Sequence, residues 1–239
     1  MDMLNKFDRI HFAARQNRWL RYFTIFCRIL LAYAFITAGL IKVLDERFAS
    51  GLSPLHPMGA YLEALHHTGY YYTFIGIAQI IAAVLLLIPR TVVLGAVLYF
   101  PIILNICILS LAVRFEGSYV TSPLMVLANL YILIWYYDRL KFILPFKQFP
   151  DSDILKKPEK YNNKFPFLFF TGVAVTFGIV ILVFLYGNEV MPRNALADCK
   201  KQFSATEKES IGFKFCECIH IKGNTLTNCL EEYKADSLR

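Results

Sequence analysis

The chain has 239 residues, of which 56 % are hydrophobic and 18 % are charged, and its mean hydropathy is +0.46. A soluble domain has about 45–50 % apolar and about 25 % charged residues, so this composition excludes a disordered chain and argues against a soluble enzyme. The net charge of +7 could indicate nucleic-acid binding. The basic residues cluster at the ends of apolar runs, however, where they meet anionic lipid. We therefore expect a lipid bilayer as partner and no nucleic acid.

Residues 1–19 are basic and amphipathic, and Ile10, Phe12 and Trp19 are suited to a membrane surface. Five apolar stretches follow, each long enough to cross a bilayer, which takes about 20 residues. Lipid cannot satisfy backbone N–H and C=O groups, so each stretch should be a helix. They are Leu20–Leu44, Tyr70–Pro89, Val92–Val113, Tyr119–Tyr137 and Phe165–Tyr186.

The predicted fold is an all-α membrane protein with five parts. We expect a cytoplasmic leader (1–19), a four-helix transmembrane bundle (20–138), a basic cytoplasmic linker (139–164), a fifth transmembrane helix (165–186) and a small helical tail stapled by disulfides (187–239). Within the loop between the first two spans, Met58–His67 should form a short helix. The tail should hold two helices, Asn194–Ser210 and Thr225–Ala235.

The distribution of Lys and Arg predicts the orientation in the membrane. Basic residues are concentrated in the leader and the linker, and Arg90 lies between the second and third spans. The two other short loops hold only Arg47 and Arg114. We expect a multi-pass protein of the inner membrane, with its N-terminus in the cytoplasm and its tail on the extracytoplasmic (periplasmic) side. Arg114 and Glu116 are expected to cap a tight turn.

Four of the six cysteines lie in the tail, at Cys199, Cys216, Cys218 and Cys229. An even set in a small exported segment predicts two disulfides. Three pairings are open, and a Cys216–Cys218 bond is disfavoured because the two residues are so close in sequence. Four thiolates can also hold zinc, but the C-x-C spacing and the exported location favour disulfides. No metal site is expected elsewhere.

Charged and small residues share one face of the first span, at spacings of three and four. These residues are Arg28, Ala32, Phe35, Gly39 and Lys42. Ala32 and Gly39 would let a neighbouring helix approach closely. Arg28 and Lys42 can be explained as a snorkelling residue and an end anchor, but the shared face favours an inward role.

Three amides lie near the middle of three other spans: Gln79, Asn105 and Asn129. Each would be unsatisfied in lipid, so each should point into the bundle. They could simply join helices through hydrogen bonds, or they could bind a ligand. Together with Arg28, Gly39 and Lys42 they form the candidate cofactor-binding site. No catalytic residue is assigned.

The region from about residue 20 to 145 resembles the DoxX family. Three sequence features carry the resemblance: Arg28-x10-Gly39-x2-Lys42 followed by Val43-Leu44-Asp45, the short turn after Leu87-Ile88-Pro89-Arg90, and the fourth span from Thr121-Ser122-Pro123-Leu124 through Asn129 to Asp138. The fifth span and the cysteine tail depart from the four-span pattern of that family and look like an added module.

The resemblance implies a four-helix membrane bundle and two kinds of role. One named member is a small membrane subunit of a thiosulfate:quinone oxidoreductase, so we expect a non-catalytic or quinone-binding subunit of a membrane oxidoreductase, with quinone as the cofactor. Other DoxX-like proteins act as membrane chaperones, which makes an assembly subunit that binds a partner through its exported tail the alternative. A thiol–disulfide relay through Cys216 and Cys218 is the third hypothesis. We also expect a protein partner or a homo-oligomer in the membrane.

Overall fold

The computed structural model describes residues 10–140 and 161–238. Within these two ranges the chain is helical and forms no strand; one isolated bridge joins Asn17 and Asn162. Most of the predicted linker, and the first half of the predicted leader, lie outside the described residues. Residues 10–15 of the leader are helical, and Ile10, Phe12 and Trp19 are exposed.

The chain is a multi-pass membrane protein. Among the described residues, four helices are long and apolar enough to cross a membrane: α2 (Arg18–Val43), α4 (Tyr70–Leu87), α5 (Val92–Ala112) and α8 (Phe167–Tyr186). The fourth predicted span is the shorter helix α6 (Thr121–Trp135), which is followed by α7 (Tyr137–Leu140). With 15 residues, α6 is about 22 Å long, less than the roughly 30 Å of the hydrocarbon core. All five predicted spans are therefore helices, and the fourth is shorter than predicted.

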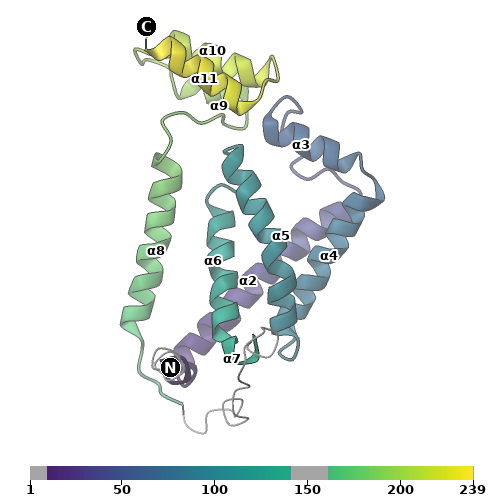
Figure 1. The fold of residues 1–239 in the computed structure, drawn as a ribbon, viewed down its shortest axis with the longest axis vertical. Coiled ribbons are helices and arrows are strands. Elements are labelled where there is room, and N and C mark those ends of the chain that lie inside the picture. Colours follow the sequence, from purple (N-terminus) through teal and green to yellow (C-terminus); the bar gives the residue numbers. More distant parts are fainter. Residues whose placement is uncertain (1–9, 141–160, 239) are drawn as a thin grey trace, which may run out of the picture.

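Helices α2, α4, α5 and α6 form the predicted four-helix bundle (Figure 1). Each packs on the next in the order α2–α4–α5–α6, and α6 returns to contact α2. Small residues at the helix interfaces allow this close packing. The buried apolar core comprises Cys27, Leu31, Ala32, Phe35, Ala82, Ala83, Leu86, Val92, Ala96, Tyr99, Ile103 and Ile132.

At the end of the bundle near the N-terminus, polar contacts fix where α2 begins. The Asn17 side chain accepts hydrogen bonds from the backbone N–H groups of Trp19 and Leu20, at 2.9 and 3.3 Å. These are donors that a helix leaves unpaired in its first turn. Arg15 forms an ion pair of 2.5 Å with the buried Asp138 of α7, which ties the leader to the end of α6.

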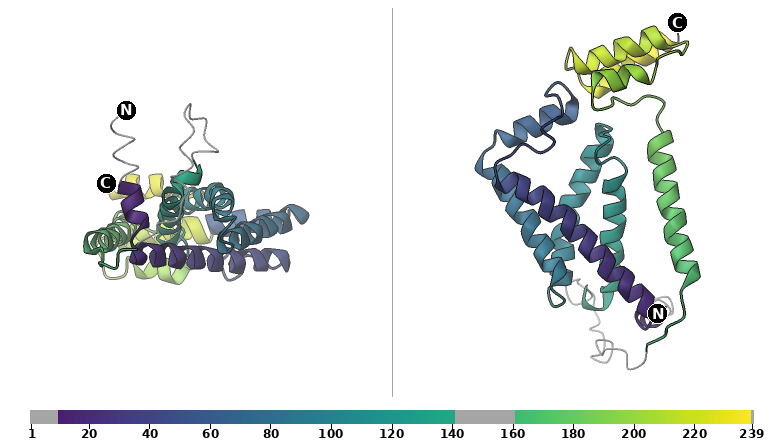
Figure 2. Two further views of the ribbon diagram at one scale, coloured as in Figure 1. Left: turned by 90° about the horizontal axis from the view of Figure 1, so that it is seen from below. Right: turned by 180° about the vertical axis from the view of Figure 1, so that it is seen from behind.

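Helix α8 runs beside the bundle rather than within it (Figures 1 and 2). None of its residues is buried. It leads from the end of the bundle near the N-terminus to the tail, which lies at the opposite end beside α3 (Pro57–His66). The helix predicted over Met58–His67 is thus confirmed to within one residue at each end.

The tail contains three helices rather than the two predicted: α9 (Leu196–Lys201), α10 (Glu209–His220) and α11 (Leu226–Ser237). The helix predicted over 194–210 is wrong because the chain turns after α9. Ser204 and Thr206 donate to the carbonyls of Lys200 and Phe203, and such local bonds compete with helix formation. The turn places the Phe203 ring over Gly212, where no larger residue would fit.

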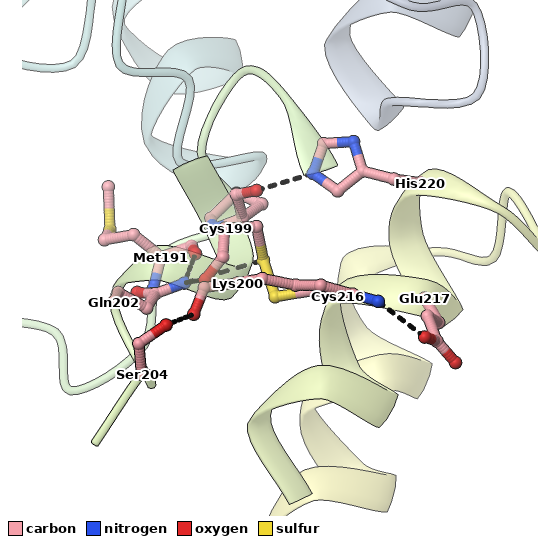
Figure 3. Close-up of a disulfide and its surroundings, with 9 residues drawn as sticks. Met191, Cys199, Lys200, Gln202, Ser204, Cys216, Glu217 and His220 are labelled. Atoms are coloured by element: carbon pink, nitrogen blue, oxygen red, sulfur yellow. Dashed lines mark hydrogen bonds and ion pairs between the residues drawn. A yellow bond between two sulfur atoms is a disulfide. The ribbon is translucent and has the colours of Figure 1, made fainter. Parts of the chain in front are cut away.

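Two disulfides hold the tail together, as predicted. Cys199 bonds to Cys216, and Cys218 bonds to Cys229, so α10 is linked to α9 on one side and to α11 on the other (Figure 3 shows the first bond). All four cysteines are buried. The disfavoured Cys216–Cys218 bond is absent, and each cysteine of the C-x-C pair is joined to a different helix.

Candidate intramembrane ligand site

The predicted stripe on α2 is confirmed: Arg28, Ala32, Phe35, Gly39 and Lys42 are all buried. Its members have different neighbours, however. Arg28 donates from Nε to the Leu86 carbonyl and from Nη2 to the Leu87 carbonyl, both at 2.7 Å. These are the last carbonyls of α4, which have no partner within their own helix. In this structure Arg28 therefore caps α4.

Gly39 marks the crossing of α2 and α4. A Cβ added to Gly39 would lie 2.7 Å from the Gly76 carbonyl oxygen, and a Cβ on Gly76 would lie 2.7 Å from that of Gly39. The expected close approach of a neighbouring helix at Gly39 is thus confirmed. It also brings α4 against Lys42, because a Cβ on Gly76 would lie 2.8 Å from the Lys42 Cβ.

A cavity of about 1570 Å³ lies between the bundle and α8, with α3 at one end. Pockets for small ligands are usually about 300–1,000 Å³ and mostly apolar, with a few polar groups. This cavity is larger and is lined mainly by apolar side chains. Of the six candidate residues, Lys42, Gln79 and Asn105 line it, whereas Arg28, Gly39 and Asn129 do not.

Lys42 brings a positive charge to the cavity wall. Its side chain is 7 % exposed, and Nζ donates to the Ala38 carbonyl at 3.0 Å and lies 4.6 Å from the centre of the Phe48 ring. In the described part of the chain, no carboxylate forms an ion pair with Lys42. An ammonium has three donors, so Lys42 can also donate to an oxygen of a molecule in the cavity.

Gln79 brings an unpaired acceptor to the same wall. Its side chain is 1 % exposed, and Oε1 has no hydrogen-bond partner among the described residues. Leaving a buried polar atom unpaired costs about 1–3 kcal/mol. Gln79 lies three residues after Gly76, hence one helical turn from the contact with Lys42. A ligand with a donor beside an acceptor would match this pair.

The other two amides differ from each other. Asn129 is buried as predicted, and its Nδ2 donates to the Ala96 carbonyl of α5 at 3.1 Å, so it joins α6 to α5. Asn105 was expected to point into the bundle, and this is wrong: it is exposed and lines the cavity. The physical reason is that α8 stands away from α5 and leaves that face uncovered. Asn105 is therefore a third polar group within reach of a ligand.

The predictions missed the residues that dock the tail. Arg114 was expected to cap a turn, but it donates from Nη1 to the Val190 carbonyl at 2.6 Å. Glu116 was given the same role and instead forms an ion pair with Arg193. These partners lie about 76 residues apart. No local spacing in the sequence signals such a contact.

Two histidines complete the docking contact. His56, which is fully buried, begins α3: its Nδ1 accepts from the Met58 backbone N–H at 3.1 Å. Its ring centre lies 5.8 Å from that of His220, whose Nε2 is 2.8 Å from the Pro192 carbonyl oxygen. Burial, and secondarily the charge of His220, lower the pKa of His56 to about 4, and the Arg193 backbone opposes this shift. His56 is thus neutral at pH 7 when the tail is docked.

Comparison with known proteins gives one informative match. The chain is 36 % identical over 153 residues to the uncharacterized protein YwoB of Bacillus subtilis (strain 168), and the alignment covers 62 % of this chain and 94 % of YwoB. The chain belongs to the YwoB family. No family model and no solved structure match it.

The match to YwoB leaves more than a third of this chain unaligned. The start of α2 at Arg18 and the first disulfide cysteine, Cys199, are more than 153 residues apart, so the alignment of 153 residues cannot contain both. Membership of the YwoB family therefore carries over to only part of the architecture. The name assigns no activity to the cavity.

Proposed function

We propose that this member of the YwoB family is a DoxX-like integral membrane protein that serves as a quinone-binding subunit of a membrane redox complex. The observation that carries the proposal is the large apolar cavity whose wall holds both the buried Lys42 ammonium and the unpaired Gln79 side chain. The sequence resemblance of residues 20–145 to the DoxX family supports the class of protein.

The residues on the cavity wall fit a quinone head. Quinone oxygens accept hydrogen bonds, which suits the Lys42 ammonium, and the hydroxyl of the reduced form can donate to the unpaired Gln79 Oε1. Phe35 lines the cavity and stacks on Tyr99, with ring centres 3.5 Å apart, so a flat aromatic surface is held near the head. When bound, the quinone supplies two-electron redox chemistry; the protein binds and orients it. A partner subunit of the complex supplies or takes the electrons.

The test is quinone retention in mild detergent. We expect chains purified from native membranes to carry about one quinone each, Lys42→Met to reduce this about tenfold or more, and Gln79→Leu to reduce retention of the reduced form by a smaller factor. A hydrogen bond to a charged group is worth about 1.5–3 kcal/mol, and 1.4 kcal/mol is a factor of ten. Asn129→Leu is the matched control, since Asn129 is a buried amide outside the cavity. The proposal is refuted if both cavity variants retain as much quinone as the wild type, or if the wild type retains none.

We propose an orientation with the N-terminus in the cytoplasm of the cell and the tail on the periplasmic side of the inner membrane. Support comes from the basic residues near the start of α2 and between α4 and α5, and from two disulfides, which persist in oxidising compartments. An impermeant maleimide added to intact cells should label a cysteine introduced at Ser237 and spare one introduced at Arg90. The reverse pattern would invert the proposed topology.

The second candidate function is a non-enzymatic assembly or chaperone subunit. The observation that favours it is α8, of which no residue is buried, so a transmembrane helix of a partner has a surface to bind. In that case a protein should co-purify in fixed ratio without quinone, and it should be lost when residues 187–239 are removed. The first function would be favoured if quinone co-purifies and is lost on Lys42→Met, and if no protein depends on residues 187–239 for co-purification.

A further inference from the structure

Aromatic contacts hold helix α8 against the bundle near each of its two ends. At one end, the centre of the Phe169 ring lies 5.4 Å from that of Phe23 on α2. At the other end, the Phe184 ring lies 5.3 Å from the ring of Tyr119, whose hydroxyl also accepts from the Asn188 side chain at 2.6 Å. These contacts fix the helix at both ends, and between them residues from the middle of α8 line the cavity.

The middle of α8 forms one wall of the cavity. Gly172, Val173, Thr176 and Phe177 line it. A Cβ added to Gly172 would meet nothing within 4 Å, so the space beside this glycine is open. Gly178, six residues further along the same helix, also has no neighbour within 4 Å of an added Cβ, but it does not line the cavity.

The cavity has a charged group and an unpaired polar group on the bundle and a mainly apolar wall on α8. Lys42 and Gln79 are on α2 and α4, α8 contributes mainly apolar side chains, and Phe26 and Leu30 of α2 add further apolar lining. A molecule with a polar head and a long apolar part matches this lining. The volume, well above that of ordinary ligand pockets, also leaves room for a long molecule.

We propose that the cavity binds one long-chain amphiphile from the bilayer, with its head at Lys42 and Gln79 and its chain between α8 and the bundle, and that Gly172 is the position that leaves room for the chain. The inference rests on the proposed function, in that the same cavity is the ligand site. It adds a chain-binding wall and a residue that selects for chain length. The uncovered middle of α8 is where the chain enters from the lipid.

The experiment compares Gly172→Leu with Gly178→Leu in the full-length chain. Each variant is loaded in detergent with a quinone that carries a long isoprenoid chain or with its short-chain analogue, and bound molecules are counted by native mass spectrometry. We expect Gly172→Leu to bind the long-chain quinone about tenfold more weakly, because its side chain takes the place of buried chain methylenes. It should bind the short-chain analogue like the wild type. Gly178→Leu should match the wild type for both.

Thr176→Leu, which alters the same wall without a glycine, should repeat the result of Gly172→Leu. Both variants should retain the wild-type thermal unfolding midpoint, since a Cβ added at Gly172 meets nothing within 4 Å and both side chains project into the cavity. Equal long-chain binding by the wild type and both cavity variants overturns the inference. So does a wild type that binds no long-chain molecule.

Native lipids retained by the same samples separate this inference from the proposed function. A phospholipid bound in place of quinone, and lost on Gly172→Leu, would support the chain site and refute the quinone function. Quinone that is lost on Lys42→Met but retained on Gly172→Leu would support the quinone function and refute the chain site.

Discussion

Gly39 and Gly76 face each other where α2 crosses α4, and a Cβ added to either glycine would lie only 2.7 Å from the carbonyl oxygen of the other, which is a clash. No side chain fits at either position without moving a backbone. The crossing fixes α4 against Lys42 and therefore the relation of Lys42 to Gln79, one turn further along α4. The packing of the bundle and the geometry of the ligand site thus depend on the same contact.

The first prediction concerns this crossing. Gly39→Val should destabilise the bundle by about 1–3 kcal/mol, the usual cost of inserting methyl groups into a well-packed site. The measurement is unfolding in detergent by heat or denaturant. Gly178→Val on α8, where nothing lies within 4 Å of the new Cβ, should leave the midpoint unchanged. If Gly39→Val unfolds at the same midpoint as the wild type, α2 and α4 can move apart at this crossing with no loss of stability.

The second prediction separates Arg28 from the ligand site. Arg28→Met removes two hydrogen bonds to the end of α4, and we expect a loss of about 1.5–3 kcal/mol in stability. Quinone retention by the folded fraction should be unchanged, because Arg28 does not line the cavity. Arg28→Lys should recover only part of the stability, since lysine lacks the planar fork that reaches both carbonyls. If Arg28→Met lost quinone but kept wild-type stability, Arg28 would instead be a ligand-binding residue.

Hydrophobicity and helical spacing were sufficient to predict most of the membrane part from sequence. A run of about 20 apolar residues has few alternatives in lipid, so the spans were found. The three- and four-residue spacing placed Lys42 and Gly39 on one buried face. The same reasoning could not assign Arg28, because its acceptors lie 58 and 59 residues away. It also misplaced Asn105, whose exposure depends on how far α8 stands from α5.

The tail was predicted less well, for a local and a long-range reason. Two disulfides follow from four cysteines in a small exported segment, but their pairing depends on helices whose ends the sequence marks poorly. Ala205 adopts a positive φ of 64°, which is uncommon for a residue with a side chain and carries no sequence signal. The docking of Glu116 to Arg193 joins residues 77 apart, so charge alone could not distinguish it from a solvated surface pair.

The third prediction concerns the disulfides. A non-reducing peptide map should contain Cys199 joined to Cys216 and Cys218 joined to Cys229, and the folded tail should resist both alkylation and exchange with an added thiol, since all four sulfurs are buried. Replacing Cys199 and Cys216 together by serine should destabilise the tail by about 2–4 kcal/mol. Rapid exchange at Cys216 or Cys218 in the folded protein would instead revive the thiol–disulfide relay.

The fourth prediction is a loss of tail docking in acid. The pKa of the docked His56 is about 4, below its ordinary value of 6.5, so the undocked state binds a proton first. The stabilisation is complete above pH 6.5 and falls as the pH drops towards 4. Protonation of His56 removes the Nδ1 acceptor of the Met58 N–H. It also places a positive charge near His220 and Arg193, and the Glu116 carboxylate beside them is already paired with Arg193. Hydrogen exchange of residues 188–238 should rise over this range. In His56→Asn the cap is kept, because Asn is a good N-cap residue, and the contribution of His56 to the pH dependence should vanish. An identical acid response in both proteins would place the titrating group elsewhere.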